Sequence, residues 1–244
     1  MITINCEKAV AFDSPDHIMP WGTRKDNSRN KRFNEKLYGL YGGRILTILD
    51  MGCSGGGFVK DCIDDGNVAI GLEGSDFSKK TKRAEWRTIP EALFTCDITR
   101  GFTIYDNKQK MLFDVITAWE VMEHIKEDDI SHICDNVQTN LKLGGLWIMS
   151  ISMSRETING IDLHQTIKPR TWWIEQFAKK GFVHLDVGSS YFNGQYIRGK
   201  ELPDSFHLVL TNNKANAPKF PRLSMKQKII DAVVGSKVQR LMKY

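Results

Sequence analysis

The sequence predicts an α/β fold in which a doubly wound, mostly parallel sheet carries helices on both faces. Two observations lead to this class. Short apolar runs alternate with segments of helical periodicity from residue 45 onward. The runs are nearly continuous in apolar residues, as strands buried on both faces are. Alternation of strand and helix is the pattern from which parallel sheets are built.

The first of these strands is predicted at residues 45–51 and is followed by a glycine-rich loop at residues 52–57. A helix over residues 56–65 begins in that loop. Missing side chains allow the backbone of such a loop to approach a ligand closely, and a helix N-terminus favours polar or anionic groups. The strand, loop and helix therefore predict a site for a nucleotide-like ligand.

The remaining elements follow in order along the chain. Strands are predicted at 68–73, 91–97, 113–119, 146–152, 182–187 and 206–210, and helices at 77–87, 128–143 and 170–180. The last two strands follow one another without a predicted helix between them. We therefore expect a hairpin there, which places one antiparallel strand at the edge of an otherwise parallel sheet.

The chain divides into three parts. Residues 1–43 form a helical extension or lid with a short helix at 33–40, and residues 44–211 form the main domain. Residues 212–244 hold eight Lys or Arg and one acid, so the net charge of this tail is +7. Because the net charge of the whole chain is +5, the rest of the chain carries −2. Its apolar residues recur at helical spacing and predict a basic amphipathic helix. Packing of that helix on the domain is the favoured interpretation; contact with an anionic membrane surface or a partner is the alternative.

Composition excludes several classes of protein. The chain has 41% hydrophobic and 26% charged residues, as ordinary globular proteins do, and has neither an apolar run of membrane-spanning length nor a secretory signal. The near-neutral main domain argues against a nucleic-acid groove, so no nucleic-acid partner is expected. The five cysteines show no zinc or redox spacing, which fits free thiols in a reducing, cytoplasmic location.

Acids and small residues follow the strands where ligands bind in open α/β sheets, beyond the carboxyl ends. Glu73 ends the second strand about 20 residues after the glycine loop, where an acid can accept hydrogen bonds from both hydroxyls of a ribose. Asp97 ends the third strand, where it can accept from an adenine amine while Ile98 packs on the ring. The alternatives are a solvated surface acid for Glu73 and a helix cap for Asp97.

The sequence of the loop itself limits the class of nucleotide-like ligand that it can bind. A dinucleotide fingerprint requires GxGxxG, but Ser54 stands at the second required glycine. Asp50 precedes the loop, where its charge would repel two phosphates but attract an ammonium or sulfonium group. The loop therefore favours an adenosine that carries a cationic tail.

Five segments in this order resemble the motifs of class I S-adenosylmethionine-dependent methyltransferases: DMGCSGG at 50–56, GLEGS at 71–75, CDI at 96–98, FDVITAWEVMEHI at 113–125 and LKLGGL at 141–146. The sequence departs from the family pattern at Ser54 and at Leu143, which replace a glycine and a proline. The resemblance implies a Rossmann-like sheet of seven strands and S-adenosylmethionine as cofactor, with S-adenosylhomocysteine as product. The implied cofactor-binding residues are Asp50, Gly52, Cys53, Ser54, Gly56, Glu73, Gly74, Asp97, Ile98, Trp119 and Glu120.

The form of the fourth motif is similar to that of enzymes that methylate oxygen or carbon of small molecules, including sugars. The sequence lacks the NPPY or DPPY signature of enzymes that methylate amino groups of nucleic acids, and a cysteine nucleophile in the fourth motif. We therefore expect methyl transfer to a hydroxyl of a small molecule or glycan, with a sugar favoured. The alternatives are a C- or N-methyltransferase of another small molecule or a protein, and a catalytically silent binding or regulatory subunit.

His124 is the first predicted catalytic residue and His164 the second, because an alcohol gains from a general base and histidine titrates near neutral pH. The alternative for His124 is a histidine that caps or packs against the next helix. A divalent metal bound by Glu120 and Glu123 with His124 or Asp162 is possible, but no ligand spacing compels it and no metal site is predicted. Aromatic residues are available for a substrate wall, although more of them are expected in the core: Trp172, Trp173, Tyr191, Phe192 and Tyr196. Trp21 is expected to anchor the N-terminal segment, with pocket lining as the alternative.

Overall fold

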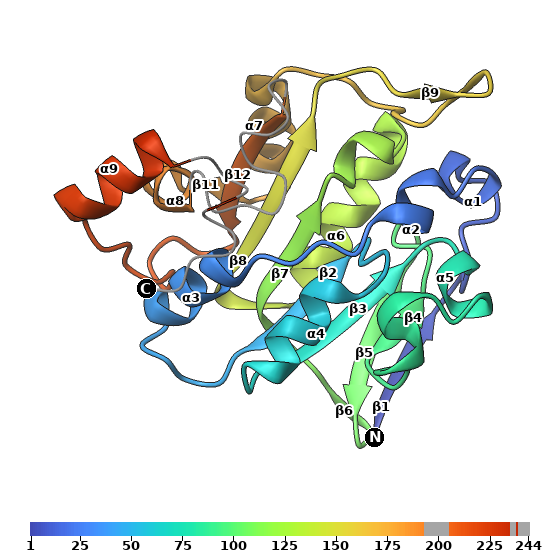
Figure 1. Cartoon of the computed structure of the whole chain (residues 1–244), viewed down its shortest axis with the longest axis horizontal. Helices are drawn as coiled ribbons and strands as arrows, with labels where there is room; N and C mark the ends of the chain where they lie inside the picture. The colour runs from blue at the N-terminus through green and yellow to red at the C-terminus, as the bar shows by residue number, and fades with distance from the viewer. Residues whose placement is uncertain (193–204, 235–237, 239–244) are drawn as a thin grey trace.

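A computed structural model describes residues 1–192, 205–234 and 238, and its centre is a seven-stranded sheet (Figure 1). The strand order is β11-β12-β8-β7-β2-β3-β4. The strands are β2 (Thr47–Met51), β3 (Val68–Glu73), β4 (Leu93–Thr95), β7 (Phe113–Trp119), β8 (Leu141–Ser152), β11 (Val183–His184) and β12 (Ser205–Thr211). The pairs from β8 to β4 are parallel, and β12 runs antiparallel to both β8 and β11. The predicted fold class is confirmed.

The helices cover both faces of this sheet, and the sheet's apolar side chains divide between two clusters. The main ones are α3 (Lys31–Leu40), α4 (Gly57–Asp64), α6 (Ile130–Asn140), α7 (Arg170–Lys179) and α8 (Asp186–Phe192). Side chains of α6 and α7 pack in one cluster, and those of α3, α4 and α8 pack in the other. Neighbouring residues of one strand point to opposite sides, so Ile48 joins the second cluster and Leu49 the first.

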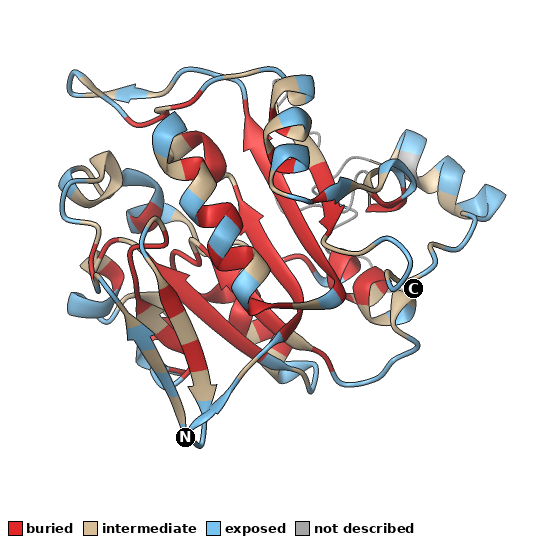
Figure 2. Ribbon diagram, turned by 180° about the vertical axis from the view of Figure 1, so that it is seen from behind, coloured by how far each residue is buried: buried red, intermediate tan, exposed pale blue. Residues whose placement is uncertain are grey.

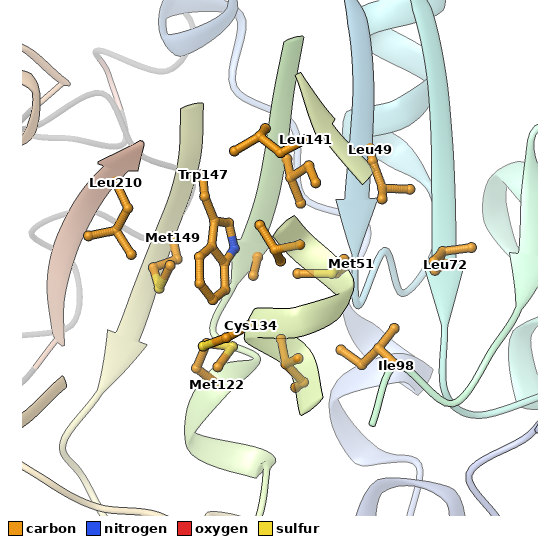
Figure 3. Packing of buried hydrophobic residues seen from close by; sticks show 14 of the residues in the cluster. Leu49, Met51, Leu72, Ile98, Met122, Cys134, Leu141, Trp147, Met149 and Leu210 are labelled. Atoms are coloured by element: carbon orange, nitrogen blue, oxygen red, sulfur yellow. The ribbon is translucent and has the colours of Figure 1, made fainter. Parts of the chain in front are cut away.

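Strand β8 shows the depth of this burial. Trp147 and Met149 face α6 and α7 and lie beside Leu210 of β12 (Figure 3). The side chains of Leu146 and Ile148 lie in the opposite cluster. The central strands are buried almost throughout, whereas the helices expose their outer faces (Figure 2). Burial on both faces explains why these strands consist mostly of apolar residues.

A second, smaller sheet was not predicted. Strand β1 (Ile2–Cys6) pairs antiparallel with β5 (Phe102–Asp106), which also pairs with β6 (Gln109–Lys110). Alternate residues of β1 are partly buried, a period-two pattern that was visible in the sequence. The N-terminal extension therefore contains a strand as well as the helices α1 (Pro15–Ile18), α2 (Trp21–Lys25) and α3.

Three predicted elements need correction. The predicted helix at 77–87 is two short pieces, α5 (Phe77–Lys80) and a 3₁₀ turn η1 (Ala84–Arg87). The predicted helix at 128–143 begins after a 3₁₀ turn η3 (Glu127–Asp129) and ends at Asn140, because the chain turns extended at Leu141 and enters β8. The expected final hairpin is wrong: β11 and β12 do pair, but α8 begins two residues after β11.

The C-terminal segment contains α9 (Met225–Val233), whose first turn forms a capping box between Ser224 at the N-cap and Gln227 at the third helical position. Met225, Ile229 and Val233 are 71%, 57% and 77% exposed, so the favoured packing of this apolar face on the domain is wrong for these side chains. Within the described residues, no helix combines the length and apolar character needed to cross a bilayer.

Candidate active site

The carboxyl ends of β2, β3, β7 and β8 open onto one cavity of about 860 Å³. The arrowheads of β7 and β8 point to the end of the molecule where α1, α2 and the hairpin of β9 (Thr157–Ile158) and β10 (Ile161–Asp162) lie (Figure 1). This is the position at which open α/β sheets bind ligands. The volume lies in the range of small-molecule and cofactor pockets.

Most of the predicted cofactor residues line this cavity. The structure brings together Gly52, Ser54, Glu73, Gly74, Asp97, Ile98, Trp119 and Glu120, which come from four different strand ends. Asp50, Cys53 and Gly56 lie behind the lining. Cys53 packs its sulfur against Gly71 of β3, and Gly56 takes a left-handed φ of 84° directly before α4. These residues shape the loop without facing the cavity.

Asp50 is buried under the glycine loop. Its carboxylate accepts a 2.6 Å hydrogen bond from the Thr117 hydroxyl of the neighbouring strand. Burial raises the pKa of Asp50 to about 8, against the opposing effect of the Thr117 hydrogen bond. Without a cationic ligand nearby, this carboxyl is therefore largely protonated at neutral pH.

Ser54 connects the glycine loop to the N-terminal segment. Its φ of 48° is left-handed, the conformation that glycine adopts most readily. Its hydroxyl donates to the Asp26 carbonyl at 2.9 Å and accepts from the Arg83 guanidinium at 3.0 Å. Trp86 Nε1 donates to the Ser54 carbonyl at 2.8 Å. The serine that departs from the family's glycine thus attaches the segment around α2 to the loop.

Two substitutions separate the strain at this position from its hydrogen bonds. We expect Ser54→Ala to lower the free energy of unfolding by about 2 kcal/mol, because the hydrogen bonds of the hydroxyl are lost while the left-handed backbone remains. Ser54→Gly loses the same contacts but relieves backbone strain of about 1 kcal/mol. Chemical denaturation should therefore rank the glycine variant above the alanine variant. The opposite order would contradict the left-handed conformation.

Glu73 and Asp97 mark one end of the cavity. Glu73 Oε2 accepts from the Ser54 N–H at 2.7 Å, and Oε1 accepts from the Ser75 N–H at 3.1 Å. Burial raises the pKa of Glu73, although the donors oppose the shift. Asp97 Oδ1 accepts from the Thr99 hydroxyl at 2.6 Å. Both acids are buried and face the cavity with their carboxylates held in place.

The other end of the cavity holds both predicted catalytic histidines. His124 lies in the 3₁₀ turn η2 (Met122–His124) after β7, and its ring centroid is 4.6 Å from that of His164. Glu123 positions the second histidine, because its backbone carbonyl accepts from the N–H groups of Gln165 and Thr166 at 2.7 and 2.9 Å. The structure therefore joins two residues that lie 40 positions apart in sequence.

The two imidazoles differ in charge. Burial disfavours protonation of His124, but Asp16, whose Oδ2 lies 2.9 Å from Nδ1, and Glu123 outweigh it and raise the pKa of His124 to about 9. Burial and the charge of His124 lower the pKa of His164. His164 Nδ1 lies 2.6 Å from the Ser154 carbonyl, which can only accept, so Nδ1 carries the proton and Nε2 the lone pair.

Several cavity residues were missed by the sequence prediction. Asp16 and Thr23 of the N-terminal segment face His124 and Glu73, and neither was among the predicted site residues. Trp21 lines the cavity, as the alternative interpretation held. Trp172, Trp173, Tyr191 and Phe192 do not line it, and the last three are buried core residues. Tyr196 lies outside the described residues.

The structure brings some of the possible metal ligands together and places another one elsewhere. Asp162 of β10 points elsewhere, toward the Thr157 hydroxyl and the Arg155 guanidinium. Glu123, His124 and His164 gather, each offering one atom, within 4.8 Å of one another. Glu120 lies nearby with a left-handed φ of 53° and lines the cavity.

Comparisons with known proteins agree with this fold. The model of a methyltransferase domain family matches residues 20–197. A structure of an S-adenosylmethionine-dependent methyltransferase from Clostridium acetobutylicum ATCC 824 is 15% identical, covers 81% of this chain and 97% of its own, and has a TM-score of 0.56. The glycopeptide N-methyltransferase MtfA with S-adenosylhomocysteine is 13% identical over 80% of this chain and 94% of its own, with a TM-score of 0.51. No curated protein matches the sequence.

Proposed function

Because the chain belongs to the methyltransferase domain family, it is a methyltransferase with S-adenosylmethionine as cofactor, and we propose that it methylates a hydroxyl of a small molecule or glycan. A sugar is the favoured acceptor. The observation that carries this proposal is the continuity of the cavity, which joins the acids Glu73 and Asp97 at one end to His124 and His164 at the other.

The cofactor fits the residues of the first end. Glu73 is the proposed acceptor for the ribose hydroxyls, and Asp97 with Ile98 is proposed to hold the adenine. Gly52 and Ser54 of the glycine loop line the same cavity, so the methionine part of the cofactor would lie over them. In this arrangement the methyl group would point toward His124 and His164, which line the same cavity.

The reaction needs an oxygen nucleophile in line with the bond from methyl carbon to sulfur. An oxygen lone pair of the acceptor forms the new C–O bond, the C–S bond breaks, and its electron pair stays on sulfur as S-adenosylhomocysteine forms. The hydroxyl proton must leave as well. We propose the lone pair of His164 Nε2 as the group that would receive it in the protein alone, since the raised pKa of His124 favours its protonated form.

The lining supports a hydroxyl-rich acceptor. Eight carboxylates face the cavity against four Lys or Arg side chains, so acceptors of hydrogen bonds outnumber cationic donors. Hydroxyl groups of a sugar can donate to such carboxylates, and an anionic polymer such as a nucleic acid would be repelled. We keep the absence of a nucleic-acid partner as part of the proposal.

The test uses S-adenosylmethionine with a ¹³C-labelled methyl group. Calorimetry first measures cofactor binding, and the protein is then incubated with nucleotide sugars, free sugars, phenols, peptides and amines. The ¹³C shift of the product distinguishes O-, N- and C-methyl groups. Label on a sugar oxygen supports the proposal, and label only on nitrogen or carbon replaces it with the alternative. Failure to bind the cofactor at millimolar concentration would overturn the assignment as an enzyme.

Two further parts of the proposal concern the surroundings of the protein. All five cysteines are free thiols and four are buried, which supports a reducing, cytoplasmic location. The exposed Met225, Ile229 and Val233 of α9 support contact of this basic helix with an anionic membrane surface or a partner.

A further inference from the structure

We propose that Glu123, His124 and His164 bind a divalent transition-metal ion, which activates the acceptor hydroxyl in the reaction proposed above. One carboxylate oxygen and one ring nitrogen of each histidine lie within 4.8 Å of one another. A single ion at the centre of such a triangle can contact all three atoms after small side-chain movements, since its bonds to nitrogen and oxygen are about 2.0–2.2 Å. The inference rests on the proposed function for its catalytic part only.

Glu123 supplies the strongest argument. Its side chain is fully buried, and Oε1 accepts from the Ser152 N–H at 2.9 Å. Oε2 is also buried, and no donor in the described part of the chain forms a hydrogen bond with it. Buried carboxylate oxygens without partners are rare because desolvation is costly. A bound cation would satisfy this atom.

The histidines have the outer contacts that metal ligands usually have. The Ser154 carbonyl fixes the Nδ1–H tautomer of His164 and turns the lone pair of Nε2 away from it. On His124, Asp16 is paired with Nδ1 at 2.9 Å, which leaves Nε2 as the nitrogen for the ion. Carboxylates or carbonyls beside the second ring nitrogen orient such ligands and increase their basicity.

The surrounding charge favours a cation. Glu120 Oε1 is buried without a hydrogen-bond partner among the described residues, and Glu156 Oε2 lies 3.3 Å from His164 Nε2. With Asp16 and Glu123, four carboxylates thus surround two imidazoles. Only neutral imidazole coordinates, so binding of the ion would release any proton from the two ligating ring nitrogens.

The ligand set also indicates which ion is bound. Two imidazoles and one carboxylate suit Zn²⁺, Co²⁺, Mn²⁺ or Fe²⁺ better than Mg²⁺, which prefers oxygen ligands. Three protein ligands leave a position for the acceptor oxygen. The ion would lower the pKa of that hydroxyl, so its proton leaves to solvent and the oxygen attacks the methyl carbon as described above. His164 then acts as a ligand instead of as the base.

The experiment titrates Zn²⁺, Mn²⁺ and Mg²⁺ into tag-free, chelator-treated protein by calorimetry. We expect one ion per chain, bound more tightly for Zn²⁺ than for Mn²⁺ and most weakly for Mg²⁺. Glu123→Gln and His164→Ala should each weaken Zn²⁺ and Mn²⁺ binding by about 100-fold. The matched control His132→Ala removes a histidine that pairs with Asp129 outside the cluster, and it should bind like the wild type. The absorption spectrum of bound Co²⁺ should change in His164→Ala.

The outcomes are separable. No bound ion, or equal binding by all variants, would overturn the metal site. Circular dichroism and cofactor titration of the same variants show whether each one folds. If Glu123→Gln does not fold, the Co²⁺ spectrum of His164→Ala tests the metal site in its place. Ion binding without cofactor binding would refute the proposed function but support the metal site. Cofactor binding without ion binding would refute the metal site but leave the proposed function in place.

Discussion

Glu73→Ala is expected to lower the affinity for S-adenosylmethionine by about 100-fold. Hydrogen bonds from the ribose hydroxyls to a charged acceptor contribute about 1.5–3 kcal/mol each, and the alanine removes that acceptor. It also frees the Ser54 and Ser75 N–H groups that the carboxylate now holds, so the glycine loop loses a support. Calorimetric titration of both proteins with the cofactor measures the change.

The controls for this prediction use a second acid and pH. Glu91→Ala removes an exposed carboxylate in the turn before β4 and should leave cofactor affinity unchanged. Because burial raises the pKa of Glu73, acidification protonates it early and removes an acceptor, so affinity should fall with falling pH in the wild type. The alanine variant should lack this part of the pH dependence. An affinity within threefold of the wild type in Glu73→Ala would refute the ribose contact.

Gly52→Ala should abolish measurable cofactor binding and lower the free energy of unfolding by about 3 kcal/mol. Gly52 has a φ of 74°, which costs a residue with a side chain about 1–2 kcal/mol. A Cβ atom there would lie 2.4 Å from Val121 Cγ2, so the loop or the turn after β7 must move. Both Gly52 and Val121 line the cavity, and the movement therefore distorts the cofactor site. Denaturant unfolding and cofactor calorimetry test both effects.

Two variants separate the two causes. Gly66→Ala introduces a Cβ at a φ of 88° where no heavy atom lies within 4 Å. It should cost about 1 kcal/mol for the backbone alone and leave cofactor affinity unchanged. Val121→Ala in the background of Gly52→Ala removes the clash and should restore at least 1 kcal/mol. If this double variant showed purely additive effects, the contact between the two residues would not be the cause.

The order of strands and helices was predictable because each core element carries its own periodicity. Residues 113–119 are apolar except for Asp114 and Thr117, and β7 is buried at every position. The errors occurred where local signals were weak or where tertiary contacts decided. The short strand β1 is stabilised by pairing with β5, about 100 residues away. Helix α8 depends on packing of Tyr191 and Phe192 against α3 and Phe220, and that environment cannot be derived from residues 182–192 alone.

The sequence by itself determined the fold class and the strand ends at which the acids lie. Apolar periodicity and parallel topology place Glu73, Asp97 and Glu120 at the carboxyl ends of the strands, on one side of the sheet. Only the tertiary structure decided what those residues contact. It pairs Asp16 with His124 and attaches the N-terminal segment to the loop through the Ser54 hydroxyl. It also turns Asp162 toward Arg155, away from the histidines. It also brought His164 to Glu123 and His124, because the backbone after His164 donates to the Glu123 carbonyl. These contacts join segments far apart in the chain, and their energies depend on burial that no local sequence pattern records.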